Sequence, residues 1–124
     1  MKAKPPDILT DTIVRRPRLT GTEPCTRTEA KVQFFHASYD TRRPEVQAAL
    51  RACRRCPLNA ECNIWALARP EQVSDGIFGG TTPRQRLTQR RQLVDRCGDE
   101  AAVENVLRRA YQQAVHRRTR NTNP

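Results

Sequence analysis

Three of the five cysteines lie within ten residues, in the stretch CRRCPLNAEC from Cys53 to Cys62. This C-x2-C-x5-C spacing lets the sulfurs of Cys53 and Cys56 converge on one metal at a helix end. A four-thiolate site needs one more ligand, which either Cys25 or Cys97 could supply. Such a site can hold a tetrahedral zinc ion or an iron–sulfur cluster, and ligand type alone does not separate the two.

Three features of this region favour the cluster over zinc. The run is compact and contains a single CxxC, a proline follows Cys56 directly, and aromatic residues lie before and within the site. The aromatic residues are the doublet Phe34–Phe35 and Trp65. We expect the doublet to pack in the core and to cover whatever the cysteines hold, because cluster stability depends on solvent access.

The size and composition of the chain favour such a stabilising site. Of its 124 residues, 36% are hydrophobic and 5% aromatic, too few for a large self-sufficient core. We expect one small domain with appendages. Residues 1–24 read as a flexible arm, residues 25–96 as a metal-binding domain with a basic helix, and residues 97–124 as an amphipathic helix with a basic tail.

Helical periodicity predicts an all-α fold of three to four helices, and two of them carry the cysteine run. Pro44 opens the first helix, in which Cys53 shares a face with apolar residues. Pro57 opens the second, which Pro70 ends. Cys62 lies on the apolar stripe of this second helix together with Trp65, so both are expected to point inward.

Two further helices follow. Thr82, Pro83 and Gln85 form a capping-box start for the third, which Gly98 ends. The fourth runs from Asp99 to about Arg117 and has a regular apolar stripe. That stripe could cap the domain, dimerise or bind another partner.

Residues 76–80, GIFGG, are expected to form a tight turn, here called the glycine turn, because its glycines permit positive φ values. It holds Ile77 and Phe78 at its tip. An aromatic between glycines can be a contact site for a partner, but Phe78 can equally fold back onto the core.

The charge is strongly positive: 23 Lys and Arg against 13 Asp and Glu give +10, and 20 of the 23 are Arg. This balance predicts attraction to nucleic acid, although an excess of Arg also raises solubility. The candidates for phosphate contacts lie on the third helix: Arg84, Arg86, Arg90 and Arg91.

Several classes of protein are disfavoured. No apolar run is long enough to span a membrane, and the N-terminus lacks the apolar core of a secretory signal, so a cytoplasmic protein with reduced thiols is expected. Two histidines and no paired-carboxylate setting argue against an enzyme. Cys53-Arg-Arg-Cys56 could act as a dithiol oxidoreductase, but the βαβ frame of that class is absent.

The order of these motifs resembles the WhiB-like proteins of actinobacteria and their phages. A single cysteine precedes a Phe-Phe doublet, then come C-x2-C-x5-C with its proline, a glycine turn with an aromatic, and a basic helix. The resemblance covers about residues 25–91.

This resemblance implies a small helical domain around a [4Fe-4S] cluster held by Cys25, Cys53, Cys56 and Cys62. It also implies a transcriptional regulator that binds the C-terminal region of the primary sigma factor and responds to oxygen or nitric oxide. The glycine turn and nearby apolar residues, Phe34, Phe35 and Trp65 among them, would contact sigma, and the basic segment would contact DNA. Zinc remains the alternative, in a DNA-binding protein that needs no sigma partner.

Two features depart from the family pattern. Phe78 stands where the family usually has Trp, which keeps an apolar plate but loses the indole N–H. The chain also continues through an extra amphipathic helix. Cys97 is left over and is expected to be a free thiol.

Overall fold

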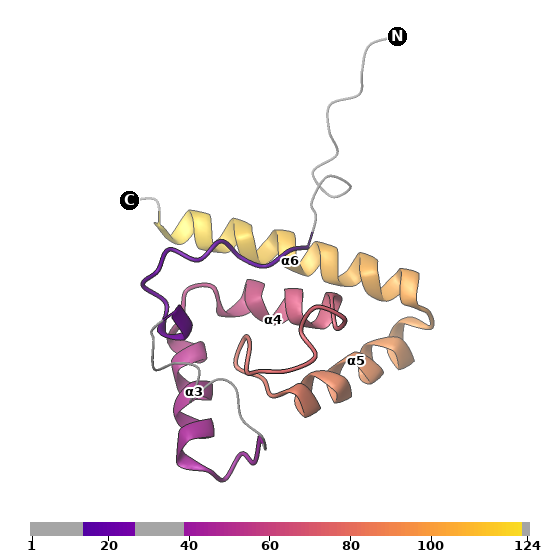
Figure 1. Ribbon diagram of the computed structural model, residues 1–124. Coiled ribbons are helices and arrows are strands. Elements are labelled where there is room, and N and C mark those ends of the chain that lie inside the picture. Colours follow the sequence, from indigo (N-terminus) through magenta and orange to yellow (C-terminus); the bar gives the residue numbers. More distant parts are fainter. Residues whose placement is uncertain (1–13, 27–38, 123–124) are drawn as a thin grey trace.

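The computed structural model describes residues 14–26 and 39–122. Within them the chain is helical (Figure 1), with a single 3-10 turn, η1 (Pro24–Thr26), followed by α3 (Pro44–Arg55), α4 (Asn59–Ala68), α5 (Pro83–Cys97) and α6 (Glu100–Thr122). The described residues form no strand, only an isolated bridge between Phe78 and Thr81. The all-α prediction is confirmed.

The ends of α3 and α4 follow from the prolines and cysteines between them. α3 begins at Pro44 as predicted. α4 begins at Asn59, two residues later than predicted, because Cys56 is extended and the Asn59 N–H donates to the Cys56 carbonyl at 3.1 Å. Pro57 disfavours a helical conformation for Cys56, so the chain makes a turn there before the next helix starts.

The predicted caps of α5 and α6 are present. Thr82 Oγ1 accepts from the Gln85 N–H, and the Gln85 side chain accepts from the Thr82 N–H at 3.0 Å, which completes the capping box. Asp99 caps α6 by accepting from the Ala102 N–H at 2.8 Å. α6 continues to Thr122, beyond the expected end near Arg117. None of the described helices is both long and apolar enough to cross a membrane.

The buried side chains form two separate clusters. The larger joins α4 to α6 and to two segments outside the helices; its buried members are Val14, Trp65, Ala66, Leu67, Ala68, Val73, Val103, Leu107 and Tyr111. The smaller belongs to α3 and the glycine turn: Val46, Ala49, Leu50 and Ile77. The apolar stripe of α6 therefore packs within the domain, against α4 and α5.

Residues 14–24, here called the strap, run alongside α6 and lead into η1 (Figure 1). They belong to the stretch expected to be a flexible arm, but Val14 is only 2% exposed in the larger cluster and Pro17 is also buried. The Tyr111 hydroxyl on α6 donates to the Arg15 carbonyl at 2.9 Å. This part of the arm is therefore packed against the C-terminal helix.

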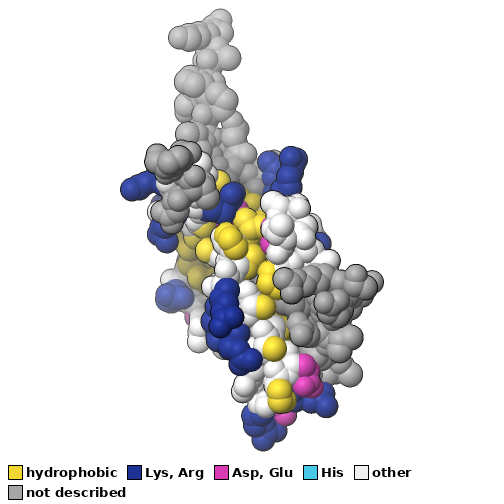
Figure 2. All heavy atoms as spheres, turned by 90° about the vertical axis from the view of Figure 1, so that its left-hand side faces the viewer, with side chains coloured by type: hydrophobic (Ala, Val, Ile, Leu, Met, Phe, Trp, Pro, Cys, Tyr) yellow, Lys and Arg dark blue, Asp and Glu magenta, His cyan; other side chains and the backbone are white. Residues whose placement is uncertain are grey.

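Basic side chains are spread over the face of the molecule that Figure 2 shows, and acidic ones are few on it. α3 contributes exposed arginines at 51, 54 and 55. The positive charge is thus not confined to α5.

Candidate metal centre

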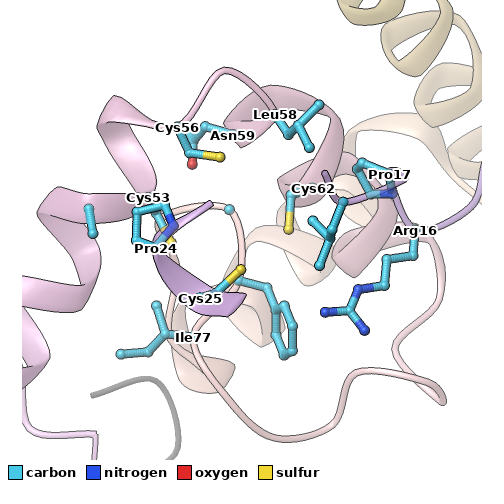
Figure 3. Close-up of a pocket in the computed structure, with 14 residues that line it drawn as sticks. Arg16, Pro17, Pro24, Cys25, Cys53, Cys56, Leu58, Asn59, Cys62 and Ile77 are labelled. Atoms are coloured by element: carbon cyan, nitrogen blue, oxygen red, sulfur yellow. The ribbon is translucent and has the colours of Figure 1, made fainter. Parts of the chain in front are cut away.

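Four cysteines line one pocket, here called the cysteine pocket (Figure 3). Cys25 comes from η1, Cys53 from the last turn of α3, Cys56 from the end of that helix, and Cys62 from the first turns of α4. These are the four residues that the family resemblance implied as ligands. Cys97 does not line the pocket; it is half-buried at the end of α5 and packs against the larger cluster.

The pocket lies between the two apolar clusters. Cys62 packs against the larger cluster and Cys53 against the smaller one. Because α3 has only its small cluster to hold it, a group bound by these cysteines would join α3 to the rest of the molecule.

Local hydrogen bonds set the positions of the run. The Cys56 N–H donates to the Cys53 carbonyl at 3.0 Å, which closes the last turn of α3. The Cys62 N–H donates to the Leu58 carbonyl at 2.8 Å, so Cys62 is held in the first helical turns of α4. The turn between the helices therefore brings both ends of the run to the same pocket.

Burial disfavours free thiolates at Cys53 and Cys62. Burial raises the pKa of Cys53 to about 11, although the N–H groups of Gly80 and Gly79 act in the opposite direction. Burial and then the charge of Cys53 raise the pKa of Cys62 to about 12. The pKa of Cys25 is raised by burial and then by Cys56, while Arg16 lowers it. The thiols of Cys53 and Cys62 are thus protonated at neutral pH unless a cationic group binds and displaces the protons.

The glycine turn closes one side of the pocket. Phe78 and Thr81 exchange N–H···O bonds of 3.1 and 3.0 Å, and the two residues between them, Gly79 and Gly80, have φ of +58° and +74°. Both φ values match a type I′ turn. Gly79 also lies so close to α4 that a Cβ built on it would be 2.3 Å from the Asn63 backbone. This geometry directs the glycine N–H groups at the Cys53 sulfur.

The apolar side chains at the glycine turn are mostly turned toward the core. Ile77 is 1% exposed and packs in the smaller cluster. Phe78 is half-buried and meets Trp65 edge to face, with ring centres 5.7 Å apart. Trp65 itself is 5% exposed. Of these three side chains, only Phe78 keeps a solvent-facing part in the described structure; Phe34 and Phe35 lie outside the described residues.

The four arginines predicted to contact DNA have different environments. Arg84 and Arg91 are exposed. Arg90 is half-buried and donates to the Leu67 carbonyl and to Glu100. Arg86 is 5% exposed.

The expectation of a phosphate contact does not fit Arg86. Its guanidinium donates to the carbonyls of Thr81 at 2.8 Å, Gly76 at 2.9 Å and Val73 at 3.2 Å. It also lies over the Phe78 ring, 5.7 Å from the ring centre. No backbone N–H of the described residues donates to the carbonyls of Val73 and Gly76, so the buried guanidinium satisfies them. Arg86 is therefore a structural residue of the turn.

The donor set fits an iron–sulfur cluster. Four thiols face one pocket whose lining is otherwise mostly apolar, and peptide N–H groups point at the sulfurs. Among the described side chains, no three of Cys, His, Asp or Glu are grouped as ligands of one metal ion. Zinc and an iron–sulfur cluster both take four thiolates, so the donor set alone does not separate them.

The strap supplies pocket residues that the sequence reasoning missed. Arg16, Pro17 and Leu19 all line the pocket, although the sequence predicts only a flexible arm there. A stretch of proline and polar residues without periodicity does not predict burial. The strap is positioned by its contact with α6, about a hundred residues away along the chain.

The fold and the pocket define a small helical protein with four cysteines around one site. The family model of the transcription factor WhiB matches residues 21–89, more than half of the chain. The chain therefore belongs to the WhiB family, a family of transcription factors. Comparisons with curated proteins and with solved structures gave no match.

Proposed function

We propose that this protein is a transcriptional regulator that holds a [4Fe-4S] cluster through Cys25, Cys53, Cys56 and Cys62. The observation that carries the proposal is the convergence of these four residues on one apolar pocket in a chain of the WhiB family. A bound cluster would supply one-electron chemistry and a target for oxygen or nitric oxide. The regulator would act in the cytoplasm, where its thiols stay reduced.

A cluster is favoured over a single zinc ion, because the four cysteines share a pocket whose lining is otherwise mostly apolar, and the stability of a cluster depends on solvent access. The alternative is a DNA-binding protein that zinc holds together and that needs no sigma partner. A dithiol oxidoreductase has less support still, because the family is one of transcription factors.

The proposed partner is the C-terminal region of the primary sigma factor. The glycine turn with Phe78 would form part of the contact. Its backbone is tied to the pocket through the N–H groups directed at Cys53 and Cys62. Loss of the bound group would therefore release the turn, and this links the state of the pocket to partner binding.

Promoter DNA is the second proposed partner. Arg84 and Arg91 on α5 remain available for phosphate contacts, and α3 carries further exposed arginines. Docking on sigma would hold these side chains near DNA at high effective concentration, so a modest intrinsic affinity suffices.

The test is anaerobic purification of the wild-type chain and of Cys53→Ala, with Cys97→Ala as the matched control. We expect about four irons and four sulfides, with absorption near roughly 410 nm, in the wild type and the control. Cys53→Ala should lose the cluster and the retention of sigma. A colourless wild type with about one zinc per chain would instead favour the zinc-held DNA binder. A Cys53→Ala chain that still retains sigma would contradict the link between pocket and docking.

A further inference from the structure

The strap carries a positive charge to the rim of the cysteine pocket. Arg16 lines the pocket, and its side chain reaches toward the pocket from the strap (Figure 3). The guanidinium carbon lies 5.8 Å from the ring centre of Trp65 and 5.9 Å from that of Phe78. These distances are within the range of cation–π attraction.

Two arginines lie near the Phe78 ring, Arg16 and Arg86. The Arg86 guanidinium donates to backbone carbonyls, whereas that of Arg16 has no hydrogen-bond acceptor among the described residues. Within the described part of the chain, no carboxylate forms an ion pair with Arg16. Its charge is therefore not neutralised by a neighbouring acidic side chain.

α6 holds the part of the strap just before Arg16. Val14, two residues before it, is buried against α6 in the larger cluster. The carbonyl of Arg15 accepts from the Tyr111 hydroxyl at 2.9 Å. Pro17, directly after it, is buried and restricts the backbone there. Residues 14–20 and α6 both lie outside the family match at 21–89.

We propose that Arg16 is the charge-compensating residue of the cluster site, and that α6 positions it through Tyr111 and Val14. The inference rests on the proposed function, because it needs an anionic group in the pocket. Four thiolates make that group negative, and one-electron reduction makes it more negative. A fixed guanidinium at the rim stabilises the reduced state more than the oxidised state and so raises the reduction potential.

The experiment measures the reduction midpoint of the anaerobic cluster-loaded chain and three variants: Arg16→Ala, Arg16→Lys and Arg15→Ala. We expect Arg16→Ala to shift the midpoint to more negative values. Arg16→Lys keeps the charge and should stay near the wild type. Arg15→Ala, the control, removes a neighbouring charge whose side chain does not line the pocket and should leave the midpoint unchanged. Equal midpoints in the wild type and Arg16→Ala would overturn the inference.

Tyr111→Phe tests the positioning by α6. It removes the hydroxyl that holds the Arg15 carbonyl and keeps the ring in the core. We expect a shift of the same sign as in Arg16→Ala, but smaller. In the Arg16→Ala background, Tyr111→Phe should cause no further shift, because the charge that it positions is already gone. If Tyr111→Phe shifts the midpoint of Arg16→Ala as much as it shifts that of the wild type, the proposed role of Tyr111 is overturned.

A second measurement needs no cluster. Trp65 is the only tryptophan of the chain, so the emission of the metal-free protein reports directly on the group above its ring. Arg16→Ala should change this emission, and Arg15→Ala should not. Unchanged emission in Arg16→Ala would overturn the placement of Arg16. A wild type that holds no cluster while its emission responds to Arg16→Ala would overturn the proposed function and leave the placement standing.

Discussion

Gly79 in the glycine turn and Arg86 on α5 carry constraints that differ from their appearance in the sequence. Gly79 is needed both for its positive φ and for its close approach to α4, whereas Gly98 has a positive φ of +96° with open space around it. Arg86 belongs to a run of basic residues, yet its guanidinium is buried under the turn. At the residue scale, chemistry therefore depends on what surrounds each side chain.

Gly79→Ala should destabilise the chain much more than Gly98→Ala. Both substitutions force an alanine into a left-handed conformation, at a cost of ~1–2 kcal/mol. Only Gly79→Ala also drives a methyl group into the Asn63 backbone, at 2.3 Å. Urea unfolding should show the difference, and cluster content should fall in Gly79→Ala alone. Equal stabilities would show that the turn can move away from α4.

Arg86→Ala should behave as a core substitution and Arg84→Ala as a surface one. Loss of the Arg86 guanidinium leaves buried carbonyls without donors, and we expect a loss of about 3 kcal/mol in the free energy of unfolding. Arg84→Ala should change stability by less than ~0.5 kcal/mol and weaken DNA binding. Urea melts and a DNA titration at two salt concentrations separate the roles. An Arg86→Ala chain of unchanged stability with weakened DNA binding would show that Arg86 contacts DNA rather than stabilises the turn.

At the scale of elements, α6 is the helix that α4, α5 and the strap pack against. It contacts α4 through the larger cluster and through ion pairs, and it also holds the strap. Arg69, at the C-terminal end of α4, binds Glu104 of α6 through two N–H···O bonds of 3.0 and 3.2 Å. The pairing with Arg69 lowers the pKa of Glu104.

Glu104→Gln should remove part of the pH dependence of stability. Because the folded-state pKa lies below the unfolded value of 4.5, the pair stabilises the chain above that pH. The contribution is lost as pH falls through the folded-state pKa. The pair is partly exposed, so we expect less than ~1 kcal/mol. Urea melts at pH 6 and pH 3.5 should show a smaller drop for Glu104→Gln than for the wild type, with Asp95→Asn as an exposed control. Identical drops would contradict the pairing.

At the scale of the whole molecule, the cysteine pocket joins two unequal bodies. α4, α5 and α6 share the larger cluster, whereas α3 has four buried residues in its own small cluster. Cys53 and Cys56 belong to α3 and its end, while Cys62 belongs to α4. A group bound in the pocket would therefore stabilise the docking of α3 rather than the formation of the other helices.

Removal of the bound group should loosen α3 and leave α4 and α6 folded. In hydrogen exchange, we expect the protection of α3 amides to fall by on the order of tenfold or more in the metal-free chain. Amides of α4 and α6 should change much less. Uniform loss of protection over all helices would indicate a chain that unfolds as one unit without its metal group.

The helices could be predicted from the sequence because their signals are local. Pro44, the Thr82–Gln85 capping box and Gly98 each act through the conformation of residues within one turn, and all of them mark helix ends in the structure. The C-x2-C-x5-C run likewise indicated a thiol site, because its spacing fits one helix end and the next helix start. The choice of Cys25 over Cys97 came only from the family resemblance.

Only the tertiary structure decided where the N-terminal strap packs and which arginines are buried. Arg16 lines the pocket because Val14 and Arg15, just before it, contact α6, and the Tyr111–Arg15 hydrogen bond spans 96 positions of the chain. The Arg86 guanidinium is buried beside the glycine turn because it donates to the carbonyls of Thr81 and Gly76. Local patterns carry no information about such partners, because the free energy of burial depends on what a distant segment brings to the same place.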